Sequence, residues 1–142
     1  VETITSFDGK VFYTQDTHGE DYLDTEEGRH LPVVHCIKGS QGWKIHPKIE
    51  KALLLKGATG IEKSTFGSEK LMGIIEKEVP DVESITLIGI CTDICVISNA
   101  MLAKAHFQNT PVTVISSACA GVTPESHENA LAAMKMCHIE IQ

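Results

Sequence analysis

Short apolar segments recur along the chain and are separated by longer stretches of mixed polarity. Several are rich in β-branched residues and are bounded by turn-forming residues, as β-strands are. We predict strands at residues 10–14 (KVFYT), 59–62, 84–90 (SITLIGI), 111–116 (PVTVIS) and 138–141. The segment at 84–90 is apolar almost throughout, which is typical of a strand covered on both faces of a sheet.

The stretches between these segments carry helical patterns. One apolar stripe begins after Ser68, a helix-capping residue type, and ends before Pro80; its members are Leu71, Ile74, Ile75 and Val79. Residues 93–107 are apolar on nearly every side, which predicts a helix packed deep against the sheet. A last stripe follows Pro124, a favourable first-turn residue, and comprises Ala130, Ala133, Met134 and Cys137.

Strands that alternate with helices predict a three-layer α/β/α fold around a mainly parallel sheet. The length of 142 residues and the hydrophobic content of 42% suit one domain with one core. In sheets of this kind, ligands bind beyond the carboxyl ends of the strands. Candidate functional residues are therefore expected where the predicted strands end.

Charge and cysteine usage narrow the class of partner. The formal net charge is −7 and the twelve Lys and Arg residues are scattered, which argues against nucleic acid or an acidic membrane surface. No apolar run approaches the ~20 residues that span a bilayer. The five cysteines lie mostly in apolar runs, which predicts reduced thiols in a cytoplasmic protein. We expect a small-molecule partner, and self-association into a homo-oligomer stays open.

Cys95 follows the end of the apolar strand at 84–90, in the sequence GICTDIC. Thr92 and Asp93 are both good N-cap types, so a helix is expected to begin there with Cys95 in its first turn. Unpaired backbone N–H groups and the positive helix end stabilise a thiolate at such a position, and the same groups can hold a developing oxyanion. Cys95 is therefore the candidate nucleophile.

A second group of polar residues follows the strand at 10–14. Asp16 and His18 are two apart in TQDTH, so both can point into one cavity, and His35 follows in LPVVHC. Two imidazoles and a carboxylate match the ligand sets of zinc, iron and manganese sites. Asp-x-His is also common in surface loops. The nearby acidic residues fit a solvated loop, although one of them could complete a coordination sphere: Glu20, Asp21, Glu26 and Glu27.

Lys63 lies in EKSTFGS, after the short strand predicted at 59–62 and before a helix. A lysine at this edge of the sheet can orient an acid or stabilise charge on a substrate oxygen. The same pattern fits an ordinary surface lysine, and the local sequence leaves both roles open.

The remaining cysteines and histidines lack partners at a useful spacing. Cys91, at the end of its strand, fits either a functional or a packing role. The others are expected to be structural or exposed: Cys36, Cys119, Cys137, His30, His46, His106, His127 and His138.

Four separated motifs together resemble the nicotinamidases and related cysteine hydrolases of the isochorismatase-like family. In chain order they are DTH (16–18), LPVVHCIKGSQGW (31–43), EKSTFGS (62–68) and GICTDICVISNA (89–100). The resemblance covers nearly the whole chain. Its most specific part is Thr-Asp-x-Cys-Val after an apolar strand that ends in glycine.

The family works through an Asp-Lys-Cys triad, so the resemblance implies that Cys95 is the nucleophile and Lys63 the second triad member. The family carries a cis peptide bond where Ile90–Cys91 falls. The resemblance therefore implies that the backbone N–H groups of Cys91 and Cys95 form the oxyanion hole.

The resemblance also implies a divalent metal ion that orients the pyridine nitrogen of the substrate. Asp16, His18 and His35 take the positions of its ligands. Zinc is the first choice, with iron and manganese as alternatives. Some relatives add an acidic fourth ligand between the two histidines, and Glu27 is the candidate for this role.

The sequence departs from the family in two places. The family's catalytic Asp lies in an Asp-x-Gln-x-Asp-Phe segment on the first strand, and residues 1–142 contain no such segment. We expect residues 1–142 to form a single hydrolase domain that lacks this central N-terminal strand and is unstable and nearly inactive without it. The second departure is that no aromatic residue stands just before His35, which weakens nicotinamide as the substrate more than it weakens amide hydrolysis.

The predicted reaction is the deamination of a small carboxamide through a thioester, with nicotinamide to nicotinate and ammonia as the leading case. One alternative is hydrolysis of another small amide or a ureide, and another is a catalytically silent binding domain. Isochorismatase chemistry is less favoured, because cleavage of its vinyl ether uses no nucleophilic cysteine.

Overall fold

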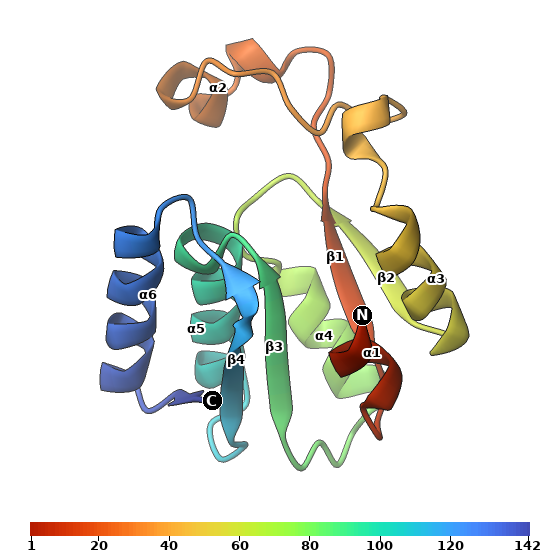
Figure 1. The fold of residues 1–142 in the computed structure, drawn as a ribbon, viewed down its shortest axis with the longest axis vertical. Helices are drawn as coiled ribbons and strands as arrows, with labels where there is room; N and C mark the ends of the chain where they lie inside the picture. Colours follow the sequence, from red (N-terminus) through yellow and green to blue (C-terminus); the bar gives the residue numbers. More distant parts are fainter. The chain divides into compact units, whose positions relative to one another are not determined.

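The computed structural model describes all 142 residues, which form two compact units, Val1–Thr65 and Phe66–Gln142. Each unit contains a parallel sheet of its own (Figure 1). The predicted α/β class and the parallel strands are therefore confirmed, with the strands divided between two sheets. No helix has the length and apolar character needed to cross a membrane.

The sheet of the first unit pairs β1 (Phe12–Asp16) with β2 (Thr59–Lys63). The two strands are parallel, and their register runs from Phe12 opposite Thr59 to Asp16 opposite Lys63. Both strands extend beyond the predicted segments at their carboxyl ends. The register therefore sets two candidate functional residues side by side at one edge of the sheet.

The first unit also contains three α-helices in segments where no helix was predicted: α1 (Glu2–Ser6), α2 (Glu26–His30) and α3 (Pro47–Leu55). Helix α3 begins where its sequence favours a start, because Pro47 is at the first turn and the His46 side chain accepts from Lys48 N. It packs against α1. Helix α2 lies where the acidic residues Glu26 and Glu27 had led us to expect a solvated loop.

The second unit has the strand order β3–β4–β5, all parallel. The strands are β3 (Ile85–Ile90), β4 (Val112–Ala120) and β5 (Glu140–Ile141). Helices α5 (Ile97–His106) and α6 (Pro124–Met136) both pack against β4 and against each other. Burial of each large apolar side chain in this core contributes about 1.5–3 kcal/mol; the fully buried ones include Val114 and Met134.

The helix ends of the second unit follow the predicted signals. The Ser68 side chain accepts from Leu71 N at the start of α4 (Glu69–Glu78), and Pro80 follows its end. Thr123 and Ser126 form a reciprocal capping box at the start of α6. The predicted helix at 93–107 begins as a π-helical turn, η3 (Thr92–Val96), and continues as α5.

Candidate functional site

Asp16, His18 and His35 come together in the first unit. Their ligand atoms all lie within 4.8 Å of one another. Asp16 Oδ2 lies 3.6 Å from His18 Nε2 and 3.9 Å from His35 Nε2. Two ligand atoms that each lie about 2.1 Å from one ion are at most about 4.2 Å apart. Both carboxylate–imidazole separations therefore fit a single metal ion.

Glu27 lies at the same cluster, where the resemblance predicts a fourth ligand. Its Oε1 atom is 3.7 Å from Nε2 of both histidines. Helix α2 positions it, because the Thr25 side chain caps the helix by accepting from Gly28 N. A Cβ at Gly28 would clash with the carbonyl oxygen of Tyr22. The glycine therefore permits the close approach that brings α2 and Glu27 to the histidines.

The imidazoles of His18 and His35 each have an Nε2 atom that can coordinate a metal ion. His18 is 5% exposed, and its Nε2 is buried without a hydrogen-bond partner. An unsatisfied buried polar atom costs about 1–3 kcal/mol, and a bound cation would remove that cost. His35 Nδ1 lies 2.8 Å from Val33 O. Because a carbonyl can only accept, Nδ1 carries the hydrogen and Nε2 of a neutral ring remains as the ligand atom.

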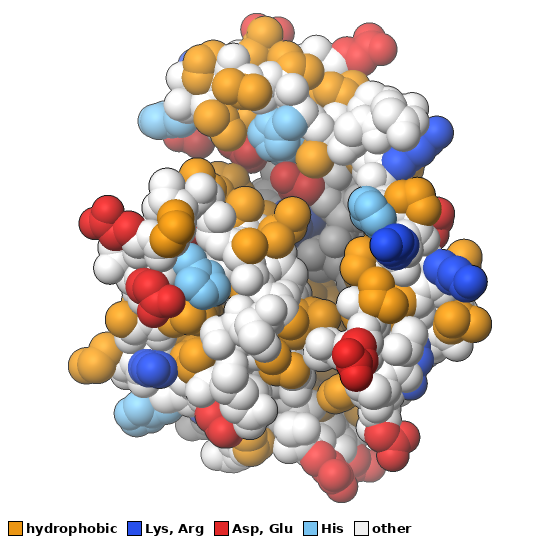
Figure 2. Space-filling model, viewed as in Figure 1, with side chains coloured by type: hydrophobic (Ala, Val, Ile, Leu, Met, Phe, Trp, Pro, Cys, Tyr) orange, Lys and Arg blue, Asp and Glu red, His pale blue; other side chains and the backbone are white.

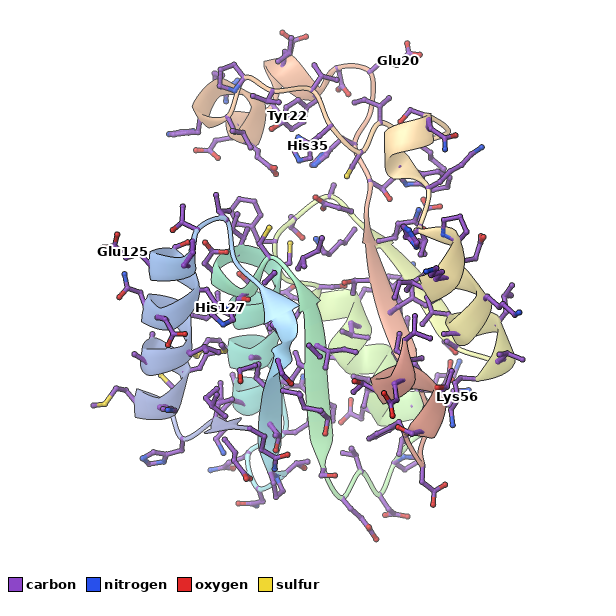
Figure 3. All side chains as sticks on the ribbon, viewed as in Figure 1. Glu20, Tyr22, His35, Lys56, Glu125 and His127 are labelled. Carbon is purple, nitrogen blue, oxygen red and sulfur yellow. The ribbon has the colours of Figure 1, made fainter.

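Tyr22 belongs to this cluster and was not singled out from the sequence. It is fully buried, and its ring centroid lies 4.7 Å from that of His18. Its ring centroid lies 5.0 Å from that of His35, and Figure 3 shows these two residues next to each other. Burial raises the pKa of Tyr22, and the negative charges of Glu27 and Asp16 raise it further. The cluster therefore has a negative field that a divalent cation would complement.

Lys63 is buried, which excludes the alternative of an ordinary surface lysine. It is 7% exposed, and its Nζ donates to Asp16 Oδ1 at 2.9 Å and to Thr65 O at 3.0 Å. A charged group is rarely buried unless it is paired. Asp16 therefore gives one carboxylate oxygen to Lys63 and turns the other toward the histidines.

Cys95 lies in the π-helical turn that follows β3 in the second unit, as the sequence predicts for the first helical turn. Val96 N donates to Cys91 O at 3.0 Å within this turn. The peptide bond Ile90–Cys91 is cis, where the resemblance places such a bond. Single π-turns occur frequently at functional sites, and the turn leaves Cys95 half-buried.

The backbone of the turn is held by Asn99, one helical turn further on. Asn99 is buried, and its Nδ2 donates to Cys95 O at 2.8 Å. Its Oδ1 accepts from Ser68 N at 3.0 Å. The Cys95 carbonyl is thereby tied to the start of helix α4.

Asp93 has a different role from the helix cap expected of it. Its carboxylate accepts from Val122 N, with its two oxygens at 3.1 and 3.2 Å. A hydrogen bond with the Ser126 side chain lowers the pKa of Asp93, and the bond with Val122 lowers it further. The carboxylate therefore joins its turn to the segment before α6.

Most of the other histidines have a hydrogen-bond or ion-pair partner nearby. The five cysteines form no disulfide, and burial raises the pKa of Cys119. Three of the histidines lie at a helix end or beside a glutamate, as structural or exposed residues do: His30, His46 and His106. His127 differs, because its Nδ1 lies 2.8 Å from Oγ1 of the buried Thr92.

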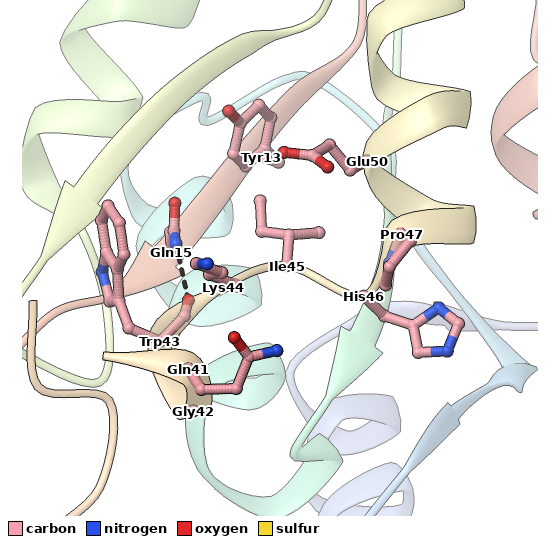
Figure 4. Close-up of a pocket in the computed structure, with 10 residues that line it drawn as sticks. All are labelled: Tyr13, Gln15, Gln41, Gly42, Trp43, Lys44, Ile45, His46, Pro47 and Glu50. Carbon is pink, nitrogen blue, oxygen red and sulfur yellow. Dashed lines mark hydrogen bonds between the residues drawn. The ribbon is translucent and has the colours of Figure 1, made fainter. Parts of the chain in front are cut away.

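A cavity of about 510 Å³ opens beside β1 in the first unit (Figure 4). Tyr13 and Gln15 line it from the strand, Trp43 and His46 from the segment that leads into α3, and Glu50 from α3 itself. Gln15 Nε2 donates to Trp43 O at 2.7 Å on its wall. None of the candidate metal ligands lines this cavity, and neither does Lys63, so the cavity is separate from the cluster.

Residues 1–141 match the family model of the isochorismatase domain. No curated protein sequence matches the chain significantly. Two solved structures are 26% identical to the chain. The nicotinamidase/pyrazinamidase of Bacillus subtilis has a TM-score of 0.78, covering 93% of this chain and 74% of that one. The pyrazinamidase/nicotinamidase of Streptococcus mutans has a TM-score of 0.75, covering 94% and 75%.

The pyrazinamidase of Pyrococcus horikoshii, solved in complex with zinc, is 23% identical. Its TM-score is 0.74, covering 94% of this chain and 75% of that one. At this identity the likeness shows the fold alone. The match with all three structures confirms the predicted α/β fold with parallel strands.

Proposed function

Because this chain belongs to the isochorismatase family of hydrolases, we propose that it deaminates a small carboxamide, with nicotinamide as the leading substrate. The observation that carries the proposal is the position of Cys95 in the turn after the carboxyl end of β3. In parallel sheets, this is the edge at which ligands bind. The likeness to nicotinamidases at 26% identity supports an amide as the substrate.

In the proposed reaction, Cys95 attacks as a thiolate. A bond forms between Sγ and the carbonyl carbon, the carbon–nitrogen bond breaks, and the nitrogen takes up the proton that the thiol released and leaves as ammonia. Water then hydrolyses the thioester and releases the carboxylic acid and the thiol. The backbone N–H groups of Cys91 and Cys95 are proposed to hold the oxyanion. Lys63 is proposed as the second catalytic residue, and its burial beside Asp16 supports this role over that of a surface lysine.

The first unit supplies the residues that would hold a divalent ion. Asp16, His18 and His35 would bind it, with Glu27 as the fourth ligand. The buried, unpartnered Nε2 of His18 supports this assignment. Zinc is the leading metal because it suits this ligand set, and iron or manganese would suit it as well. When bound, the ion would orient the pyridine nitrogen of the substrate.

A second candidate is a small amide or ureide without a pyridine ring. The side chains just before His35 are aliphatic and exposed, at 47–60%: Leu31, Val33 and Val34. Figure 2 shows hydrophobic side chains gathered over this part of the first unit. Such side chains offer a ring no aromatic stacking partner, and this observation favours the second class of substrate.

Release of ammonia from a panel of pyridine carboxamides, aliphatic amides and ureides would test the proposal. The test uses the full-length protein. We expect turnover of at least one carboxamide and its loss in Cys95→Ala. The matched control is Cys137→Ala, an exposed cysteine just after α6, which should behave as wild type. Turnover that survives Cys95→Ala, or no turnover of any amide, would contradict the proposal.

A further inference from the structure

His127 has no part in the proposed chemistry, yet it contacts the turn that carries Cys95. It lies on helix α6 (Figure 3), and its Nδ1 is 2.8 Å from Oγ1 of Thr92. Thr92 is fully buried and is the first residue of the π-helical turn. A buried hydroxyl is costly to leave without a partner. The bond therefore holds Thr92 in one position relative to α6.

A second bond joins the same turn to the same segment. Asp93, the next residue, accepts from Val122 N. Two consecutive residues of the turn are thereby attached to the stretch that runs from the end of β4 into α6. Two attachments fix the orientation of a turn more strictly than one, because a single bond leaves rotation about it.

Gly121 shows how closely that stretch approaches His127. A Cβ at position 121 would lie 2.9 Å from His127 Cβ and 3.0 Å from its backbone nitrogen. Carbon atoms do not approach this closely without a shift of the backbone. The glycine therefore permits the contact that brings the imidazole to Thr92.

We propose that His127 is a positioning residue for Cys95. Its hydrogen bond to Thr92 fixes the start of the π-helical turn, and this turn sets the direction in which the Cys95 Sγ atom points. The inference rests on the proposed function for its kinetic consequences. The reactivity of the Cys95 thiol can be measured without a substrate, so the role of His127 and the proposed function can be refuted separately.

The test compares two pairs of variants in the full chain. His127→Leu removes the hydrogen bond, and His127→Asn keeps a polar group that can reach Thr92. Thr92→Val removes only the hydroxyl at nearly constant shape, and Thr92→Ser retains it. The control is His106→Leu, a histidine on α5 of the same unit that lies beside Glu76.

The readouts are the iodoacetamide alkylation rate of Cys95, mapped by mass spectrometry, and kcat and KM for the amide that turns over. We expect His127→Leu and Thr92→Val to lower the alkylation rate and kcat about tenfold or more. A misplacement of about 1 Å at reacting atoms costs on the order of 10²-fold. KM should change less than kcat. His127→Asn and Thr92→Ser should recover most of the loss. The double variant that combines His127→Leu with Thr92→Val should lose no more activity or alkylation rate than either single variant, because both changes remove the same hydrogen bond.

Several outcomes would overturn the inference. These are a Cys95 alkylation rate in His127→Leu equal to that in His106→Leu, full additivity in the double variant, or equal loss in Thr92→Ser and Thr92→Val. If His127→Leu does not fold, the Thr92→Val and Thr92→Ser pair decides by the same readouts. If no amide turns over in the wild type, the proposed function fails, and the alkylation rates still decide the role of His127.

Discussion

Lys63 Nζ lies 2.9 Å from Asp16 Oδ1, while Oδ2 of the same carboxylate faces His18 and His35. The parallel register sets Asp16 opposite Lys63 at the carboxyl end of both strands. One carboxylate therefore serves both the lysine and the candidate metal ligands. A change at the lysine should be detectable in metal binding.

Replacement of Lys63 by Met should raise the affinity for zinc about fivefold or more, because a positive charge beside a ligand carboxylate is removed. Two unit charges 4 Å apart interact by about 1 kcal/mol in water and about 4 kcal/mol near a protein surface. Competition with a chromophoric chelator measures the affinity. Lys63→Arg should bind zinc as the wild type does. The control is Lys38→Met, whose partner Glu62 is exposed and lies outside the cluster. Unchanged or weaker zinc binding by Lys63→Met would refute the shared carboxylate.

Replacement of His18 or His35 by Ala should strip the metal and leave a folded protein. Loss of a direct ligand should lower metal affinity by more than the 10–100-fold typical of residues behind the ligands. Elemental analysis after mild purification and circular dichroism check both parts. His30→Ala is the matched control, because its side chain is exposed and bonds within α2. Wild-type protein that holds no divalent metal, and gains none on titration, would rule out the site.

Cys95 should be the first cysteine alkylated by iodoacetamide near neutral pH. It lies in the turn after the carboxyl end of β3, at the edge of a parallel sheet where ligands bind, whereas burial raises the pKa of Cys119 and slows its reaction. Mass mapping after brief treatment gives the order of modification. Earlier reaction of Cys36 or Cys119 would show that the assignment of Cys95 is wrong.

Asp93→Asn should make the stability of the second unit less dependent on acid pH. The hydrogen bond with Ser126 holds the pKa of Asp93 below its ordinary value of 3.8. A carboxyl whose folded pKa is lowered contributes stability above its unfolded pKa and loses it as the pH falls through the folded value. The variant should therefore melt a few degrees below the wild type at pH 7, and the difference should shrink below about pH 3.8. A difference that stays constant as the pH falls well below 3.8 would contradict this role of the carboxylate.

Much of the fold follows from side-chain patterns that the sequence displays directly. The apolar segment 84–90 and the stripe after Ser68 correspond to β3 and α4. Strand ends were harder to predict, because β1 and β2 continue through the polar residues Asp16 and Lys63. There the backbone pairing persists after the apolar pattern stops. The short helix α2 was missed because its acidic sequence also suits a solvated loop.

Some residues of the candidate site could likewise be predicted from the local sequence, and others could not. Asp16 and His18 are close in sequence, one as the last residue of β1 and the other two residues later, so local pattern alone brings them together. His127 was missed because its partner depends on how distant segments pack, since His127 and Thr92 are 35 positions apart. Tyr22 was missed because the loop that turns it toward His18 carries no strand or helix pattern. The glycines were the available signal, since Gly28 and Gly121 mark the places where backbone approaches Tyr22 and His127.

The most direct test of Cys95 as the nucleophile is to trap the thioester. The protein is mixed with the carboxamide that releases ammonia, quenched in acid during the first turnover, and digested for mass spectrometry. We predict an acyl group on the peptide that contains Cys95, and its absence in Cys95→Ala together with the loss of ammonia release. Ammonia release at the wild-type rate by Cys95→Ala, or an acyl group on another residue, would contradict the account.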